Sequence, residues 1–398
     1  MSIKGKAYIM GAFEHPLRDA PDTSTPQLHM ECALGALADA GLEKDDIDGY
    51  FCAGDAPGFG GMSMIDYMGL KNVRHMDSTE TGGSSYIVHV GHAAQAIAEG
   101  KCQAALITLA GRPRHGGGRP GARMAPSAAP GLTDGPPEAG FENIYGGSTH
   151  NTYGMCAMRH MHQYGTTSEQ LAWIKVAASH HAQWNEHAFL RDVVTVEEVV
   201  SSRMIADPLH LMDCCVVTDG GGAVIVTSPE VAKSLKRPKV KIMGAGEAPK
   251  SPLGGQDLDL TYSGAVWSGP RAFDEAGVKP ADIKYASIYD SFTITVLMQI
   301  EDLGFCEKGQ GGKFVADGNL ISGVGKLPFN TDGGGLCNNH PTNRGGMTKV
   351  IEAVRQLRGE AHPAVQVPDP RIALVHGTGG SLATRMGSVT LILGAEDS

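Results

Sequence analysis

Residues 36–52, ALADAGLEKDDIDGYFC, align without a gap with residues 272–288, AFDEAGVKPADIKYASI. Each segment has the pattern of a helix end, a glycine that stops the helix, an acidic turn and an apolar strand. A second matched pair starts at Gly82 and at Gly345, where a Gly-Gly turn precedes a helix pattern and an apolar strand that ends in glycine. The two halves of the chain therefore repeat one α/β unit in the same order.

The composition is that of a large globular chain. Its 398 residues exceed a typical single domain, 41% of them are hydrophobic, and 54 are glycine. A net charge of −10 argues against a nucleic-acid surface, which needs a basic stripe. No apolar stretch approaches the roughly 18 residues of a membrane-spanning helix. The first residues show no leader pattern, so we expect a cytoplasmic protein that binds neither membrane nor nucleic acid.

The eight cysteines form no Cys-x-x-Cys pair. We therefore expect reduced thiols and no structural metal. The Met/His-rich run MCAMRHMHQYG at 155–165 is more typical of a helix than of a metal site.

The repeat is interrupted once. From residue 112 to 147 the sequence becomes rich in Gly, Pro and Arg, and such a long loop inside a domain is usually functional or flexible. Two helix patterns follow before an apolar strand resumes. We predict an N-terminal half made of residues 1–111 and 213–235, an inserted region at 112–212, and a C-terminal half at 236–398.

The stretch FNTDGGGLCNNHPTNRGG at 329–346 has the most concentrated functional pattern. It holds Asn330, a run of glycines, Cys337 and His340, and it precedes the amphipathic run MTKVIEAVRQLRG, which predicts a helix. Glycines let a ligand approach the backbone, and a helix N-terminus favours an anion or enolate. This pattern predicts a site for developing negative charge. The alternative is that the glycines only turn the chain and His340 caps the helix.

The duplicated unit, the long insertion, the Asn-His-Pro sequence and the segment YASIYDSFTITVLMQIEDLGFCEKGQGGKF at 285–314 together resemble the thiolase superfamily. The nearest subgroup resembles the sterol-carrier-protein thiolases and the lipid-transfer-protein-type retro-aldolases. The resemblance implies a five-layered αβαβα fold, in which two mixed sheets sandwich a pair of buried helices. It also implies a homodimer formed through the first half.

The resemblance carries roles to His340, Tyr289 and His376, and Asp290 is a candidate from its place beside Tyr289. His340 matches the histidine of the Gly-His-Pro motif, a catalytic base and oxyanion-hole donor in thiolases, although Asn339 replaces the glycine. Tyr289 falls where thiolases have a catalytic Asn or His and related retro-aldolases have Tyr, and His376 falls at the acid/base cysteine. Asp290 orients a catalytic group or caps the helix after it. Tyr289 could otherwise be a core phenol, and His376 a turn residue.

The thiolase nucleophile is missing. Thiolases place a cysteine at the N-terminus of the buried helix of the first half, where the thiolate is favoured. Counting without a gap puts Gly83 there, and matching the glycine-rich turn puts Thr79 there. Ser84 or Ser85 could substitute, but serine at this place is more simply a helix cap.

The chemistry that remains is cleavage of a carbon–carbon bond beside a coenzyme A thioester by a retro-aldol reaction. Tyr289 or His340 would be the base, His376 would return a proton to the enolate carbon, and His340 with backbone N–H groups would hold the enolate. Coenzyme A would be part of the substrate, with no separate cofactor. The expected substrate-contacting residues are Gly83, Ser84, Ser85, Asn330, Gly334, Cys337, Gly377 and Gly379.

Two alternatives remain at this point. One is an acyltransferase of the β-ketothiolase type with an unrecognised nucleophile, and the other is a scaffold subunit without catalysis. The resemblance further implies a small zinc-ribbon/OB-fold partner protein, with the loop 112–147 as a contact region. Arg112, Arg114 and Arg119 in that loop could meet coenzyme A phosphates or a partner.

Overall fold

The computed structural model describes residues 2–115, 148–250, 259–342, 344–379 and 387–398. Strands in this part of the chain form one hydrogen-bonded nine-stranded sheet and a separate two-stranded one. The order in the large sheet is β3 (His75–Asp77), β2 (Gly49–Phe51), β4 (Ala104–Gly111), β7 (Gly220–Thr227), β1 (Tyr8–Glu14), β8 (Val240–Pro249), β11 (Gly387–Gly394), β10 (Ile372–Gly379) and β9 (Tyr285–Ile288).

The large sheet consists of two mixed sheets that touch at one corner. Strands β1 and β8 pair only at Tyr8–Lys241 and Ile9–Val240. In the first half β2 and β4 are parallel and β7 is antiparallel to β4. In the second half β9 and β10 are parallel and β11 is antiparallel to β10. Each half thus has the same strand pattern, as the repeat predicts.

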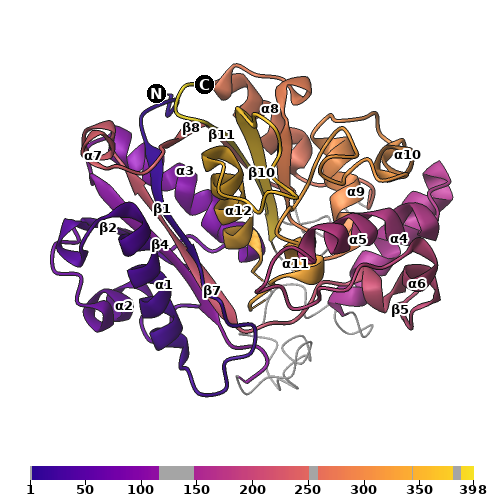
Figure 1. The fold of residues 1–398 in the computed structure, drawn as a ribbon, viewed down its shortest axis with the longest axis horizontal. Coiled ribbons are helices and arrows are strands. Elements are labelled where there is room, and N and C mark those ends of the chain that lie inside the picture. The colour runs from indigo at the N-terminus through magenta and orange to yellow at the C-terminus, as the bar shows by residue number, and fades with distance from the viewer. Residues whose placement is uncertain (1, 116–147, 251–258, 343, 380–386) are drawn as a thin grey trace.

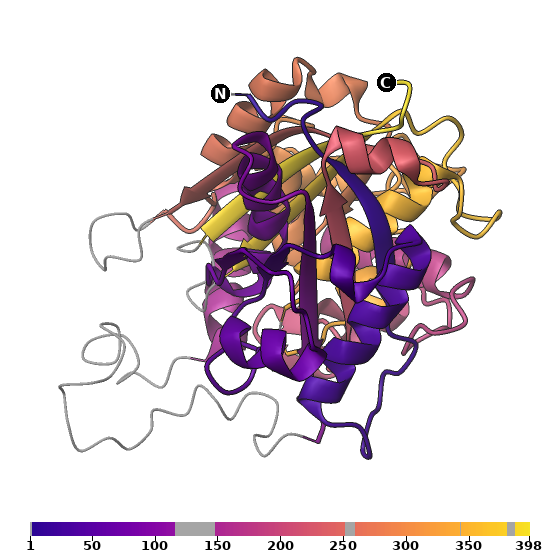
Figure 2. The same cartoon turned by 90° about the vertical axis from the view of Figure 1, so that its left-hand side faces the viewer.

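Helices complete five layers around the two sheets. The central layer is α3 (Ser85–Ala98) and α12 (Gly346–Arg358), which contact each other and strands of both sheets. The outer face of the first sheet is covered by α1 (Thr25–Ala40), with α2 (Gly61–Met68) beside it, and that of the second by α8 (Ala265–Ala276) (Figures 1 and 2). Because α3 is apolar on nearly every face, it suits a layer without solvent. The predicted αβαβα fold is confirmed.

The two sequence segments 36–52 and 272–288 have the same order of elements and the same backbone conformation at the glycine that ends each helix. Helix α1 ends at Gly41 (φ 73°, ψ 36°) and α8 ends at Gly277 (φ 70°, ψ 36°). A 3₁₀ turn follows each of them, η1 (Lys44–Asp46) and η7 (Pro280–Asp282), before β2 and β9. Glycine is needed at both ends because the left-handed conformation strains a residue with a Cβ.

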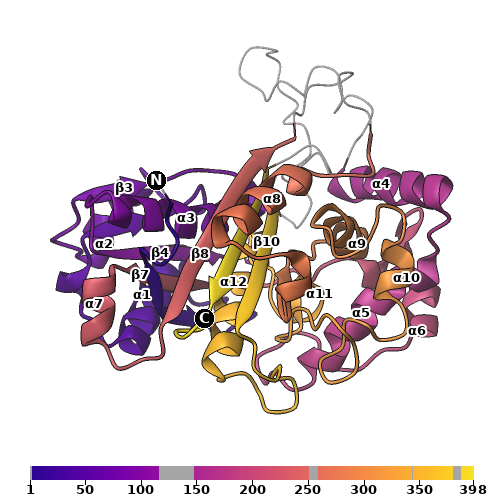
Figure 3. The same cartoon turned by 90° about the horizontal axis from the view of Figure 1, so that it is seen from above.

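Elements within the predicted insertion pack beside the second half. They are α4 (Thr149–Tyr164), α5 (Ser168–Ala182), α6 (Val196–Ser201), β5 (Met204–Ala206), β6 (Leu209–His210) and η6 (Leu211–Asp213). Helix α5 contacts α9 (Thr293–Asp302), α10 (Gly311–Val315) and α11 (Gly334–Cys337). Figure 3 shows this group on the side away from the first sheet and from α7 (Pro229–Ser234). Residues 116–147 of the predicted loop lie outside the described ranges. No helix in the described ranges is long and apolar enough to cross a membrane.

Candidate active site

A tyrosine and a histidine from two different segments form the centre of the site. Tyr289 directly follows β9, and its hydroxyl lies 2.9 Å from Nε2 of His340. The same hydroxyl accepts the N–H of Gly345 at 3.3 Å. Gly345 is the N-cap of α12, so the positive end of that helix faces the pair. The structure thus brings together the two residues that the motifs single out.

Burial decides the charge of this pair. It lowers the pKa of His340 to about 4 and raises the pKa of Tyr289 well above its usual value of 10. Both side chains are therefore neutral near pH 7, and the phenol donates to Nε2 of the imidazole. Nδ1 of His340 has no hydrogen-bond partner within the described ranges, which fits the tautomer with hydrogen on Nδ1. Such a pair can accept a proton at the phenol oxygen while the phenol proton moves to His340.

The first half contributes a glycine, and therefore no side chain, at the place that the Tyr289 phenol occupies. Gly83 lies in the 3₁₀ turn η2 (Gly82–Ser84) that leads into α3. A Cβ added at Gly83 would lie 2.4 Å from the Tyr289 hydroxyl oxygen and 2.5 Å from its Cζ. The phenol of Tyr289, from the second half, therefore fills the space beside Gly83. This is the position where the gap-free count expects the nucleophile of thiolases.

The neighbouring serines are engaged in the turn before α3. The Ser84 hydroxyl donates to the carbonyl of Thr81 at 3.0 Å, and the Ser85 hydroxyl donates to the carbonyl of Gly82 at 2.7 Å. Ser85 also accepts the N–H of Thr81 at 2.9 Å. Thr79, the other position considered for a nucleophile, bonds to Asp77 through its hydroxyl and its N–H. The hydroxyls are thus engaged within the turn, and Ser84 occupies the N-cap position of α3 without a side-chain capping bond, so the expected helix cap is not formed.

Asp290 ties the glycine-rich loop to the end of β9. Its buried carboxylate accepts the N–H groups of Gly335 at 2.8 Å and Leu336 at 3.1 Å, and it forms an ion pair of 2.7 Å with Lys349. A Cβ at Gly335 would lie 3.0 Å from Asp290 and 3.1 Å from the His340 ring. Asp290 therefore holds the loop that carries His340 and does not cap the helix after it, α9.

His376 lies on the other face of its sheet. Its Nδ1 bonds Thr390 on β11 at 2.8 Å, and that hydroxyl is 3.0 Å from Ser268 of α8. Side chains alternate along a strand, so His376 shares the α8 face with Leu374. Tyr289 lies on the face toward Gly83. Burial lowers the pKa of His376 to about 3. The structure does not bring His376 to the Tyr289–His340 pair, contrary to its predicted role as proton donor.

Asn330 and the predicted substrate-contacting glycines hold backbone segments of the site close together. Asn330 bonds both the N–H and the carbonyl of Ile288 at 2.8 Å. A Cβ at Gly334 would lie 2.2 Å from Asp290. Strand β10 approaches the turn before α3 so closely that a Cβ at Gly379 would lie 1.5 Å from the Thr81 carbonyl, and one at Gly377 would meet Ile87 and Ser84. These residues let the segments of the site approach one another.

Cys337 is enclosed by the insertion. It is 1% exposed, and its sulfur lies 3.1 Å from the Lys175 amine of α5. Burial raises the pKa of the thiol. The contact with Lys175 therefore does not produce a reactive thiolate, and the structure gives no support to the prediction that Cys337 contacts substrate.

Two of the three arginines predicted to meet coenzyme A or a partner lie in the described part of the chain. Arg112 donates to the carbonyls of Ala20 and Pro21, and Arg114 lies 3.4 Å from Asp19. Arg119 lies outside the described ranges. Among the described residues, Asp19, His115 and Asp219 have spacing that could suit a metal. Asp219 already accepts the N–H groups of Ala20 and Arg114, so ion pairs and turn contacts account for this group.

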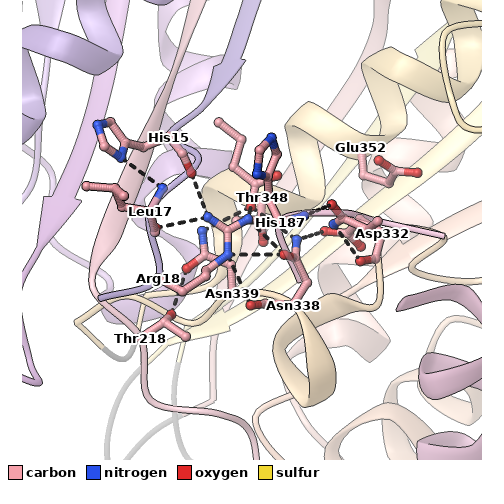
Figure 4. A network of polar contacts seen from close by, with 12 residues as sticks. His15, Leu17, Arg18, His187, Thr218, Asp332, Asn338, Asn339, Thr348 and Glu352 are labelled. Atoms are coloured by element: carbon pink, nitrogen blue, oxygen red, sulfur yellow. Dashed lines mark hydrogen bonds and ion pairs between the residues drawn. The ribbon is translucent and has the colours of Figure 1, made fainter. Parts of the chain in front are cut away.

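The sequence interpretation missed a polar network at the two asparagines before His340; Figure 4 shows Arg18, Thr218, Asn338 and Asn339 of this network. It joins Glu14 and Arg18 to Asn338 and Asn339 of the glycine-rich loop, and Asn339 to Thr218. The only signal for it was the Asn-Asn pair before His-Pro. Its partners are more than one hundred residues distant in sequence, so no local pattern could identify them.

Comparisons with known proteins agree with the fold. A family model described as thiolase C-terminal domain-like matches residues 246–395. A steroid side-chain-cleaving aldolase of Thermomonospora curvata is 34% identical over 377 residues, 90% of this chain and 91% of that protein. Benzoylsuccinyl-CoA thiolase subunit BbsB of Thauera aromatica is 38% identical over 250 residues, 62% of this chain and 64% of that protein. A solved structure titled Ltp2-ChsH2(DUF35) aldolase has a TM-score of 0.85 at 33% identity and covers 99% of each chain.

The fold, the helix N-termini and these similarities define the class: the chain belongs to the thiolase superfamily. Within the superfamily it belongs to the branch that resembles sterol carrier protein 2, which also includes side-chain-cleaving aldolases and lyases. The family predicted from the sequence motifs is confirmed.

Proposed function

We propose that this protein cleaves a carbon–carbon bond of a β-hydroxyacyl coenzyme A thioester by a retro-aldol reaction. The observation that carries the proposal is the phenol of Tyr289, which occupies the space beside Gly83 and is hydrogen-bonded to His340. The pair supplies a base, and no thiol lies at that position. The aldolase and lyase names of the relatives support the same reaction class.

The reaction uses the pair as a proton relay. The phenol oxygen of Tyr289 takes the proton of the substrate β-hydroxyl while the phenol proton moves to Nε2 of His340. The bond between the α and β carbons breaks, and a carbonyl forms at the β carbon. The electron pair of the broken bond stays on the α carbon and forms an enolate with the thioester. The N-terminus of α12 stabilises the enolate charge. The pair then returns the proton to the α carbon, so no proton is consumed.

Coenzyme A is part of the substrate in this proposal, and no separate cofactor or metal is needed. The acyltransferase alternative requires a nucleophile beside α3, and a side chain at Gly83 would collide with Tyr289. The similarity to a protein named as a thiolase subunit keeps that alternative as the one to test.

One experiment separates the two reactions. A retro-aldol cleavage forms a ketone or aldehyde and a shorter acyl-CoA without free coenzyme A, whereas thiolysis consumes free coenzyme A. The protein is incubated with β-hydroxyacyl-CoA and β-ketoacyl-CoA thioesters, each with and without free coenzyme A, and products are followed by mass spectrometry. Cleavage of only the β-hydroxy substrates, without coenzyme A, supports the proposal. Coenzyme A-dependent cleavage of the β-keto substrates with an acyl-protein adduct would overturn it.

We also propose a homodimer through the first half and a small zinc-ribbon/OB-fold partner. The support for a partner is the similarity to a structure whose title joins Ltp2 and ChsH2(DUF35). Light scattering should give twice the mass of the 41.7 kDa chain at micromolar concentration. A monomeric mass would contradict the dimer, and full activity of the chain alone would contradict a required partner.

A further inference from the structure

Glu14 is a buried carboxylate at the end of β1, in the first half of the chain. Its Oε1 accepts hydrogen bonds from the side-chain amides of Asn338 at 3.1 Å and Asn339 at 3.0 Å. It also accepts from Arg18 at 2.8 Å, and Oε2 lies 3.2 Å from Arg355 of α12. One carboxylate thus holds both residues that precede His340.

The contact continues to the backbone of the catalytic histidine. The Thr218 hydroxyl donates to Oδ1 of Asn339 at 2.7 Å and accepts the N–H of His340 at 2.8 Å. Thr218 also forms a parallel bridge with Pro341, just before β7. A continuous chain of hydrogen bonds therefore runs from Glu14 through Asn339 and Thr218 to His340.

Glu14 is the ionised centre of the network, and it is paired with two arginines. Burial alone would raise the pKa of Glu14, but the nearby Arg18 and Arg355 outweigh burial and lower it to about 2. Hydrogen bonds to an ionised acceptor are shorter and stronger than neutral ones. Among the described residues, the side chains of Asn338 and Asn339 bond Glu14, Arg18 and Thr218 from other segments and Asp332 from the same loop. The loop is therefore held largely from outside, and Figure 4 shows Arg18 and Thr218 beside it.

We infer that Glu14 is a positioning residue for His340, which acts through the amide of Asn339 and the hydroxyl of Thr218 to fix the Tyr289–His340 contact. The inference rests on the proposed retro-aldol function. It explains why asparagine stands where the related motif has glycine: a glycine at 339 offers no side chain to join Glu14 to Thr218. The first half then contributes to catalysis through a carboxylate that does not touch the substrate.

Glu14→Gln is the first test. The glutamine oxygen can still accept from the asparagines, but the negative charge facing Arg18 and Arg355 is lost, so the amides shift. We expect kcat to fall roughly 10- to 100-fold, the size expected for misplacing a catalytic group by about 1 Å, with KM changed less than about threefold. The matched control is Glu301→Gln, a buried glutamate of α9 that bonds His160 and Lys308 and, within the described ranges, has no hydrogen bond or ion pair with Glu14, Asn338 or Asn339. Its kcat should be unchanged.

A merely structural role would lower stability in both variants without this split between kcat and KM. Asn339→Gly should lower kcat as much as Glu14→Gln, and the double variant should be no worse than either single one, because both break the same chain of contacts. If Glu14→Gln does not fold, Thr218→Val decides, since valine keeps the shape and removes the contact to His340.

The outcomes are distinct. An inactive wild-type protein would overturn the proposed function. An active wild type with full kcat in Glu14→Gln and Thr218→Val would overturn the positioning role alone. Multiplying losses in the Glu14→Gln, Asn339→Gly double variant would also contradict it, because the two residues would then act independently.

Discussion

The starts of the two central helices occupy equivalent places in the repeated unit and carry opposite kinds of residue. At the start of α12 the second half supplies Tyr289 and His340, the hydrogen-bonded pair that we propose as acid and base. At the start of α3 the first half supplies Gly83, and a Cβ added at Gly346 of α12 would lie 2.2 Å from the Gly83 carbonyl. The two helix starts therefore pack against each other. The duplicated halves share one scaffold, but only the second half places ionisable side chains at its helix start. The first half has Gly83 there, and its lack of a side chain lets Tyr289 fit.

The largest effect should come from removing the ionisable residues of the second half. Tyr289→Phe and His340→Ala should each lower kcat by about 10²–10⁴-fold, as expected for a lost acid/base group. Steady-state kinetics with a β-hydroxyacyl-CoA measures the loss, and circular dichroism checks that the fold is intact. Nearly normal turnover of Tyr289→Phe would show that the second half does not supply the base through Tyr289.

A methyl group on the first half should have the next largest effect. In Gly83→Ala the new Cβ would lie 2.4 Å from the Tyr289 hydroxyl, so the phenol must move away from His340. We expect kcat to fall roughly 10- to 100-fold. In a Tyr289→Phe background the same change should add less than about threefold, because the group it displaces is already absent.

The matched control for Gly83→Ala is Gly91→Ala in the middle of α3. There a Cβ would meet only Ala245 at 3.2 Å and Leu391 at 3.9 Å, away from the pair. This variant should keep most of the activity. Full activity of Gly83→Ala, or an equal loss in Gly91→Ala, would show that Gly83 is not the point where the halves meet functionally.

Buried charge also differs between the central helices, and it predicts a dependence of stability on pH. Burial, together with the negative charge of Asp332, raises the pKa of Glu352 on α12 from 4.5 to about 7. Below pH 4.5 the group is protonated in both states and contributes nothing. As pH rises from 4.5 through 7 the unfolded chain ionises first, so the free energy of unfolding falls.

Glu352→Gln removes this loss and keeps an acceptor for Thr331. Relative to wild type it should gain on the order of 2–3 kcal/mol between pH 5 and pH 8. Denaturant unfolding at both pH values measures the difference. Glu14, whose pKa is lowered to about 2, gives the opposite dependence, and its stabilisation is lost only as pH falls below 4.5. An unchanged difference at the two pH values would show that Glu352 is ionised in the folded protein.

The smallest effect is expected at Cys337. Cys337→Ala should keep activity within about threefold and cost roughly 1–2 kcal/mol of stability, since Lys175 retains the Leu336 carbonyl. Iodoacetamide should leave Cys337 unmodified in the folded protein, as peptide mapping would show, because the thiol is buried. Loss of nearly all activity in Cys337→Ala would instead point to a cysteine nucleophile and to the acyltransferase alternative.

Local patterns were sufficient for the scaffold. The match between residues 36–52 and 272–288 predicted the repeat because glycine ends, acidic turns and apolar strands depend on neighbours in sequence. Tyr289 and His340 were predicted as the central pair because each lies in a short motif that resembles a thiolase motif. The inserted helices were also visible, but their packing against α9 and α10 was not.

The sequence by itself predicted the duplicated α/β unit from short-range periodicity, and its short motifs predicted the family and the meeting of Tyr289 with His340 through their resemblance to thiolases. Tertiary structure alone decided which face of β10 carries His376, that Tyr289 fills the space at Gly83, and that Glu14 reaches Asn339. The physical reason is that strand faces and buried hydrogen bonds are set by what packs opposite. For Glu14 and Asn339 that partner lies 325 residues away along the chain.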